Sequence, residues 1–206
     1  MTSIEKNGGC NHMTCRKCNF EFCWLCSQNW RTHSDCHVYR EEQDLTQNQA
    51  RMLLQRYLFH FERYENHAKS LKNQKKVKEK AAVMTEFMRE SALMGFAESK
   101  CFDLAIETLR ESRHVLMNTY IFAYYVKRNN HLDMFEENQR DLELAVEKLC
   151  SLFELEDLSG MDTEYIKTRV QDLTRYCNKR RQALIDHVEE GFEKGNCWVY
   201  NESGCD

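Results

Sequence analysis

Hydrophobic positions recur every three to four residues along most of this chain, which is the spacing of an amphipathic helix. The pattern predicts five helices, at residues 46–69, 75–94, 100–127, 132–155 and from 163 onward. The third carries apolar residues on most of its sides, so it is expected to lie at the centre of a bundle. Breaks between the helices are expected at Gly95 and in the segments "KRNNH" (127–131) and "DLSGMD" (157–162).

The first predicted helix carries a stripe of large apolar side chains, which are Met52, Leu53, Tyr57, Phe61 and Tyr64. Stripes with this spacing form a core more often than a ligand groove. These side chains are therefore expected to pack inside the bundle.

Composition supports long helices and a second, different module. The 206 residues include no proline and only seven glycines, so few residues would interrupt a helix. Near residue 40, cysteine, histidine and glycine give way to charged and apolar stretches. The fold class is therefore expected to be mainly α. A small zinc-stabilised irregular or β module at residues 1–39 would precede an all-helical domain at residues 40–206.

Charge and hydropathy argue against some classes of protein. The formal net charge of −4 gives no support for nucleic-acid binding. No apolar run reaches the length of about 18 residues that a membrane span needs, and the N-terminus has no apolar signal core. We therefore expect no membrane contact and a cytoplasmic protein, with the nucleus as the alternative location.

Six of the eleven cysteines lie between residues 10 and 36. From Cys15 onward the order is Cys15-x2-Cys18-x4-Cys23-x2-Cys26-x6-His33-x2-Cys36. A C-x2-C turn lets two thiolates reach one Zn²⁺ ion, so this segment is predicted to bind zinc. The later cysteines are expected to be small buried hydrophobes, except Cys197 and Cys205, which are expected in a frayed tail.

Spacing alone leaves the assignment of the ligands open. One complete site can be assembled from Cys23, Cys26, His33 and Cys36. Cys15 and Cys18 would then form half of a site whose other ligands lie upstream of this chain. Alternatively, they join the Cys23–Cys26 pair in one four-thiolate site. His37 could replace Cys36 and pair with His33 as in a two-histidine finger, but this is less favoured, because the six residues between Cys26 and His33 are too few for such a finger.

Cys10 belongs to no C-x2-C pair. It follows two glycines, which leave its thiol unshielded, and His12 would face the same side of an extended segment. A neighbouring imidazole can take the thiol proton or activate an incoming amine. Cys10 is therefore a candidate acyl-accepting nucleophile. The alternative is that Cys10 and His12 are further zinc ligands.

The stretch "IEKNGGCNHMTCRKCNFEFCWLC" (4–26), followed by Trp30, His33 and Cys36, closely resembles the second RING of RING-between-RING ubiquitin ligases, which is their catalytic domain. The helical remainder resembles the Ariadne domain of the Ariadne subfamily. The similar segments are residues 57–71, 119–130, 135–143 and 176–194.

The resemblance implies that Cys10 accepts ubiquitin as a thioester from a ubiquitin-charged conjugating enzyme and passes it to a substrate lysine. His12 matches the histidine that assists this transfer. Glu21 matches a position grouped with both in some relatives, and is otherwise a surface carboxylate. The resemblance also implies two Zn²⁺ sites, of which Cys15 and Cys18 supply only half of the first. Neddylated cullin complexes are the implied regulatory partners.

Several features of the family have no counterpart in this sequence. The first RING and the between-RING domain, which recruit the conjugating enzyme, are absent from these 206 residues, as is half of the first zinc site. In the family the Ariadne domain covers the catalytic cysteine, in part through a Phe-Glu pair where this chain has Asn73 and Gln74. Glu147 matches a second acidic contact. The inhibitory contact is therefore expected to be weakened or built differently.

Two functions stay open on the sequence. One is a ubiquitin ligase that acts through Cys10. The other is a zinc-stabilised helical module that binds partners without turnover, and it predicts that Cys10→Ser leaves function intact. A nucleic-acid-binding zinc protein is a third possibility, which the net charge disfavours.

Overall fold

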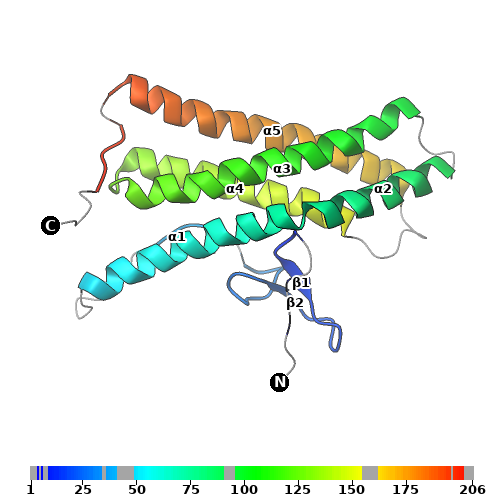
Figure 1. Cartoon of the computed structure of the whole chain (residues 1–206), viewed down its shortest axis with the longest axis horizontal. Coiled ribbons are helices and arrows are strands. Elements are labelled where there is room, and N and C mark those ends of the chain that lie inside the picture. Colours follow the sequence, from blue (N-terminus) through cyan, green and yellow to red (C-terminus); the bar gives the residue numbers. More distant parts are fainter. Residues whose placement is uncertain are drawn as a thin grey trace.

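The computed structural model describes residues 4, 6, 9–33, 36–40, 49–90, 96–154, 162–195 and 197–201. Its helices form a bundle, and a small module lies against the side of that bundle (Figure 1). The helices are α1 (Gln49–Lys72), α2 (Gln74–Glu90), α3 (Phe96–Tyr125), α4 (Asn130–Phe153) and α5 (Thr163–Glu193). The module, called here the N-terminal module (residues 4–40 where described), contains β1 (His12–Thr14) and β2 (Glu21–Cys23).

This architecture confirms the mainly helical fold with a small cysteine-rich module before it. All five predicted helices are present, and α3 is the central one, because it packs against each of the other four. The proposed boundary near residue 40 stays a prediction. Residues 46–48, Gly95 and residues 157–161 lie outside the described part of the chain.

The helix starts follow from local capping chemistry. Asn129 accepts a hydrogen bond from the backbone N–H of Leu132 at 2.8 Å, which caps α4. Asp162 caps α5 in the same way, through the N–H of Tyr165 at 3.0 Å. Short polar side chains at this position satisfy an amide that has no partner inside the helix.

The core lies where α2, α3, α4 and α5 meet. The inner face of α2 consists of its buried residues, which are Val77, Ala81, Met84 and Met88. They share one continuous core with the buried apolar residues of α3, α4 and α5. In the part of the chain that the structure describes, no helix is both long and apolar enough to cross a membrane.

The expectation for α1 is wrong. Leu53, Tyr57 and Phe61 lie on its outer face, with exposed fractions of 58%, 46% and 43%. Its buried face is polar instead, and consists of His60, Arg63, Asn66, His67 and Ser70. These side chains find hydrogen-bond partners at the contact with the N-terminal module and with other helices. Burial of a polar face is tolerated where its groups are paired in this way.

The expectation of a frayed C-terminal tail is also wrong at Cys197, which is buried. The next residue, Trp198, packs its indole onto Gly191 of α5, and its Nε1 donates to the carbonyl oxygen of Val188 at 3.0 Å. The absence of a side chain at Gly191 makes room for this ring. Cys205 lies outside the described residues.

Candidate functional site

β1 and β2 pair as an antiparallel hairpin that carries two of the predicted site residues. The register places His12 opposite Cys23 and Thr14 opposite Glu21. His12 and Glu21 are therefore diagonal neighbours on one face. His12 Nε2 lies 3.7 Å from a carboxylate oxygen of Glu21, and the imidazole stacks on Trp30 with ring centroids 4.6 Å apart. Burial lowers the pKa of His12, so its neutral, proton-accepting form is favoured near neutral pH.

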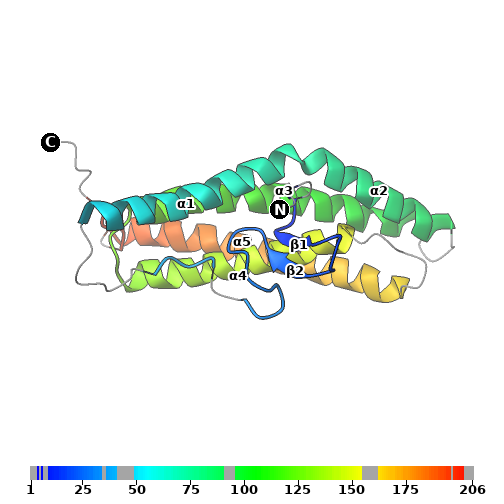
Figure 2. The same cartoon turned by 90° about the horizontal axis from the view of Figure 1, so that it is seen from below.

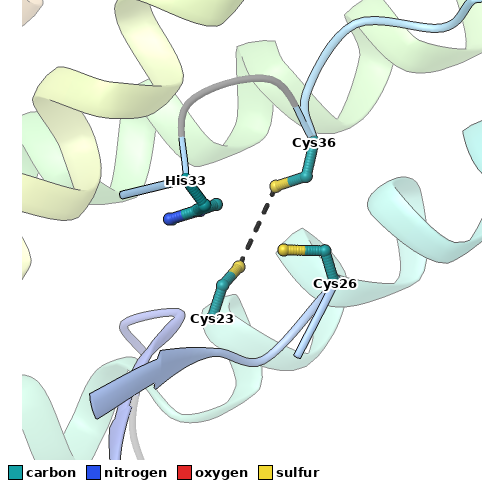
Figure 3. Close-up of side chains that lie close together, drawn as sticks. All are labelled: Cys23, Cys26, His33 and Cys36. Atoms are coloured by element: carbon teal, nitrogen blue, oxygen red, sulfur yellow. Dashed lines mark hydrogen bonds between the residues drawn. The ribbon is translucent and has the colours of Figure 1, made fainter. Parts of the chain in front are cut away.

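Four predicted metal ligands come together in one place. Ligand atoms of Cys23, Cys26, His33 and Cys36 all lie within 4.8 Å of one another, and the three sulfur atoms converge beside the His33 ring (Figure 3). This set is a possible metal site with three thiol groups and one imidazole. The structure therefore favours this grouping over a four-thiolate site that joins the two C-x2-C pairs.

The donor atoms of this cluster fit a zinc ion. Nδ1 of His33 hydrogen-bonds the carbonyl oxygen of Trp30 at 3.2 Å, so that it must be the protonated nitrogen. Nε2 of His33 is buried and has no hydrogen-bond partner among the described residues. An imidazole whose second nitrogen is held by a carbonyl group is the usual form of a zinc-binding histidine. The sulfur atoms of Cys23 and Cys36 lie 3.9 Å apart. The hydrogen bond between them lowers the pKa of Cys23 to about 4, which favours the thiolate form of Cys23.

Cys15 and Cys18 form a separate pair near the surface of the N-terminal module. Hydrogen bonds from the backbone of Lys17 and Cys18, and from the Cys18 thiol, lower the pKa of Cys15. The residue after this pair, Asn19, has a left-handed backbone with φ of 54°, and so does Ser27 (φ 59°) after the second C-x2-C pair. The two cysteine turns therefore have the same local shape, and the first presents two of the ligands that a zinc site needs.

Cys10 lies at the contact between the N-terminal module and α4, in a segment called here the Cys10 loop (residues 9–11). All three residues of the loop are buried. The backbone N–H groups of Gly9 and Cys10 donate to one carboxylate oxygen of Glu154, at 3.1 and 3.3 Å. The N–H of Asn11 donates to the carboxylate of Glu147. Two acidic side chains of one helix end thus hold three successive amides of the loop.

Ser70 of α1 and Lys6 form further hydrogen bonds with the Cys10 loop. The hydroxyl group of Ser70 donates to the carbonyl oxygen of Gly9 at 2.9 Å. The ammonium group of Lys6 donates to Oδ1 of Asn11 at 2.8 Å and also bonds Asn66 and Ser70. Burial lowers the pKa of Lys6. The loop is therefore bonded by α1 as well as by the C-terminal end of α4.

The thiol of Cys10 is fully enclosed by this arrangement. Its sulfur lies 3.8 Å from the carbonyl oxygen of Glu147 and accepts from the backbone N–H of His12 at 3.3 Å. A hydrogen bond with Cys150, burial and the nearby charge of Glu147 raise the pKa of Cys10 well above its usual value. In this arrangement Cys10 is a protonated thiol without access to solvent.

Asn73 and Gln74, the polar residues at the bend between α1 and α2, form hydrogen bonds elsewhere than at the Cys10 loop. Gln74 turns toward α3, where its amide nitrogen donates to the carbonyl oxygen of Ile106 at 3.0 Å. Asn73 stands at the bend, and its N–H donates to the carbonyl oxygen of Lys69 at 3.1 Å. Ser70, one turn earlier on α1, makes the contact with the loop instead. Whether the inhibitory contact is weakened or built differently from that of the family stays a prediction.

Two further contacts fix the N-terminal module on the bundle, across α1 and α4 (Figure 2). Arg63 of α1 donates through Nε to the carbonyl oxygen of Cys36 at 2.9 Å. Glu143 of α4 lies 2.8 Å from Nε2 of His67 and 4.0 Å from Nδ1 of His37. Burial would raise the pKa of Glu143, but His67, together with His37 and Lys6, lowers that pKa to about 2. The metal cluster and the helices are thus directly connected.

Comparison with known proteins agrees with this architecture. The sequence model of the IBR domain matches residues 1–38. The chain is 41% identical over 210 residues to "E3 ubiquitin-protein ligase ARIH1" from Homo sapiens and 40% identical over 210 residues to "E3 ubiquitin-protein ligase ariadne-1" from Drosophila melanogaster. It is 39% identical over 207 residues to "E3 ubiquitin-protein ligase dbl4" from Schizosaccharomyces pombe. Each alignment covers 97% of this chain.

The chain belongs to the Ariadne family. It spans 37% to 41% of the length of these Ariadne relatives. The named activity of the relatives is that of a ubiquitin-protein ligase, and the IBR match places the chain among RING-between-RING proteins.

Sequence reasoning identified Cys10, His12 and Glu147 but missed the other groups that surround the thiol. These are Lys6, Asn66, Ser70, Arg113, Cys150 and Glu154. Arg113 had a visible signal, because it shares a helical face with Leu109, Leu116 and Tyr120, all of which are buried. A lone charge on an apolar stripe is expensive to bury and therefore suggests a specific contact.

Proposed function

We propose that this chain is the catalytic portion of a ubiquitin ligase in which Cys10 carries ubiquitin as a thioester. Residues 1–39 would be the second RING, with the IBR match reflecting a related zinc module, and residues 40–206 the Ariadne domain. The observation that carries the proposal is the position of Cys10. It follows a glycine, and the next strand presents an imidazole paired with a carboxylate, His12 with Glu21.

The proposed reaction has two transfers at the ubiquitin C-terminal carbonyl carbon. The Cys10 thiolate attacks the thioester of the charged conjugating enzyme, a C–S bond to Cys10 forms, and the thiolate of the conjugating enzyme leaves. A lysine amine of the substrate then attacks the new thioester. His12 accepts the proton of this amine while Glu21 stabilises the resulting imidazolium, and the Cys10 thiolate leaves.

The closed arrangement must open before either transfer. Cys10 is buried between the N-terminal module and α4, and the bonds to Glu147, Glu154 and Ser70 hold it there. A bulky ubiquitin C-terminus needs that space. The helical domain would therefore act as an inhibitor of Cys10, and a partner that draws it away, such as a neddylated cullin complex, would release the activity.

Zinc has a supporting role in this proposal. Cys23, Cys26, His33 and Cys36 would hold one Zn²⁺ ion, and Cys15 and Cys18 would contribute two ligands to a second. The metal supplies rigidity to the turns that follow the Cys10 loop and takes no part in the transfer. Cytoplasm, with the nucleus as the alternative, is the compartment in which such thiols stay reduced.

The burial of Cys10 also favours a second function, which is that of an interaction module without turnover. A thioester-transfer assay separates the two. A zinc-loaded longer chain that also carries the domains that recruit the conjugating enzyme is mixed with ubiquitin-charged conjugating enzyme. It is tested beside its Glu147→Ala/Glu154→Ala variant and beside that variant with Cys10→Ala. We expect a thiol-sensitive ubiquitin adduct, stronger in the opened variant and absent without Cys10. An opened variant whose Cys10 alkylates freely but takes no ubiquitin would overturn the proposal in favour of the interaction module.

A further inference from the structure

A second cysteine lies next to Cys10 across the contact between the module and the bundle. Cys150 belongs to α4 and is fully buried, and the interaction of its thiol with that of Cys10 raises the pKa of Cys10 and lowers the pKa of Cys150. The same carboxylate oxygen of Glu154 lies 3.3 Å from the Cys10 backbone nitrogen and 3.9 Å from the Cys150 sulfur. The Cys10 sulfur also touches the carbonyl oxygen of Glu147, one helical turn before Cys150. The two cysteines thus share one carboxylate oxygen of Glu154 as a partner, and the Cys10 sulfur lies against the helical turn that carries Cys150.

The surroundings of the pair favour ionisation of Cys150, although burial and the carboxylates of Glu154 and Glu147 oppose it. The hydrogen bond from Cys10 and the nearby guanidinium of Arg113 both lower the pKa of Cys150. Arg113 is itself fully buried, and none of its three guanidinium nitrogens has a hydrogen-bond partner with suitable geometry among the described residues. A buried cation without such a partner is costly, and a thiolate beside it offsets that cost. This setting is typical of a reactive cysteine rather than of an inert buried one.

We propose that Cys10 and Cys150 are a redox pair that forms a disulfide bond in the closed arrangement and locks the Cys10 loop onto α4. Cys150 is then a modification site with a role distinct from packing. The consequence for regulation rests on the proposed function, because locking Cys10 matters only if Cys10 must be released to act.

The oxidant in this scheme is hydrogen peroxide, and the reaction has two steps. In the open arrangement the Cys10 thiolate attacks one peroxide oxygen, a sulfenic acid forms, and the other oxygen leaves as water after it takes a proton. When the module docks again, the Cys150 thiolate attacks the Cys10 sulfur, the S–S bond forms, and hydroxide leaves and becomes water. The two thiols lose two electrons in total, and one peroxide is reduced to two water molecules.

The disulfide would have two effects. It would add a covalent bond to the hydrogen bonds that close the module, so the inhibited arrangement would persist until a thiol reductant cleaves it. It would also protect Cys10, since a sulfenic acid that is captured as a disulfide cannot proceed to the irreversible sulfinic acid. An oxidised ligase would thus be stored in a recoverable form.

The test is mass spectrometry on the zinc-loaded chain during treatment with a several-fold molar excess of hydrogen peroxide. Free thiols are alkylated, and the chain is digested without reduction. We expect a peptide pair joined through Cys10 and Cys150 that dithiothreitol separates. In Cys150→Ser and in Cys150→Ala this pair is absent, and Cys10 accumulates as sulfinic acid several-fold faster than in the unaltered chain. Cys177→Ser, at a buried cysteine of α5, is the matched control and is expected to keep the pair.

Two results would overturn the inference. One is equal sulfinic acid at Cys10 with and without Cys150, and the other is a Cys10 disulfide to a different cysteine. The ubiquitin adduct assay on the reduced chain separates this failure from that of the proposed function. An adduct without the disulfide would support the proposed ligase function and overturn the redox pair. A disulfide without any adduct would support the redox pair and overturn the proposed ligase function.

Discussion

Gly9 lies so close to Arg113 that a Cβ atom added to Gly9 would stand 2.8 Å from Nη1 and 2.9 Å from Nη2 of the guanidinium group. Arg113 is fully buried in α3, so it has no free space into which it can withdraw. The absence of a side chain at Gly9 therefore allows the Cys10 loop to sit directly on the bundle. Glycine at this position therefore permits the close approach of the loop backbone to Arg113.

Gly9→Ala is expected to push the N-terminal module away from the helices. Overpacking of a filled site costs about 1–3 kcal/mol. Because about 1.4 kcal/mol corresponds to a factor of ten, alkylation of Cys10 by iodoacetamide should become about tenfold faster. Gly191→Ala is the matched control, since it creates a clash with Trp198 elsewhere in the bundle. Equal acceleration of Cys10 alkylation in both variants would mean general destabilisation and not release of the loop.

Glu147→Ala and Glu154→Ala are expected to weaken the closed arrangement separately and together. Each removes a charged acceptor of loop amides, and a hydrogen bond to a charged group contributes about 1.5–3 kcal/mol. Hydrogen exchange of the amides of residues 9–11 should become faster, and thioester formation at Cys10 should increase. Glu137→Ala, at an exposed position of the same helix, is expected to change neither.

Removal of the whole helical domain tests the same contact on a larger scale. The comparison uses a longer chain that also carries the domains that recruit the conjugating enzyme. Discharge of ubiquitin should be faster when residues 40–206 are deleted. Equal discharge with and without these residues would contradict the inhibitory role.

The sequence predicted the bundle well because its signal is local. Helical periodicity in α2 and α3 depends on residues three and four apart, and the structure places Val77, Met84 and Leu116 in the core as that pattern indicates. The C-x2-C spacing is local too. Cys23 and Cys26 can reach one metal ion from a single turn, so this half of the cluster follows from the sequence without knowledge of the fold.

The contacts that cover Cys10 could not be predicted in the same way, because they join distant segments. Ser70, Arg113 and Glu154 meet the loop from three different helices. Which face of α1 would be buried was also beyond local pattern. Its apolar stripe predicts burial, but the docked module needs hydrogen-bond donors, so Arg63 faces inward and Phe61 outward. Tertiary contacts overrode the hydrophobic pattern at that helix.

His33→Ala is expected to remove one equivalent of zinc from the chain. Nε2 of His33 is the fourth donor of the cluster with Cys23, Cys26 and Cys36, and no other described group pairs with it. Metal analysis of the purified protein should show the loss. Alkylation of Cys10 should also become faster, because the Cys36 turn that Arg63 binds is no longer ordered by a metal ion and the module docks less firmly. Cys18→Ser serves as the comparison, because Cys18 lies outside this cluster. The four-ligand site of Cys18→Ser should hold as much zinc as that of the unaltered chain. Loss of this equivalent in Cys18→Ser would contradict the grouping.

His60 provides a test of stability against pH. Burial lowers the pKa of this imidazole to about 4, against an ordinary value of about 6.5, and its Nδ1 bonds the carbonyl oxygen of Arg56 at 2.8 Å. At a pH between these two pKa values, the His60 imidazole is protonated in the unfolded chain but neutral in the folded chain. The free energy of unfolding must therefore fall as the pH is lowered through this window. For this residue alone, the decrease from pH 7 to pH 5.5 should be about 1 kcal/mol.

Urea unfolding at the two pH values, monitored by helical circular dichroism, measures that decrease. His60→Asn should be less stable at pH 7, because its amide does not fill the site of the ring, but its stability should fall less between the two values. The same change at His114, an exposed position of α3, is the control. An identical pH dependence in His60→Asn and in the unaltered chain would mean that His60 is not buried in its neutral form. Because His60 lies between Tyr39 of the N-terminal module and Tyr124 of α3, that result would also argue against the docking of residues 39–40 on the bundle.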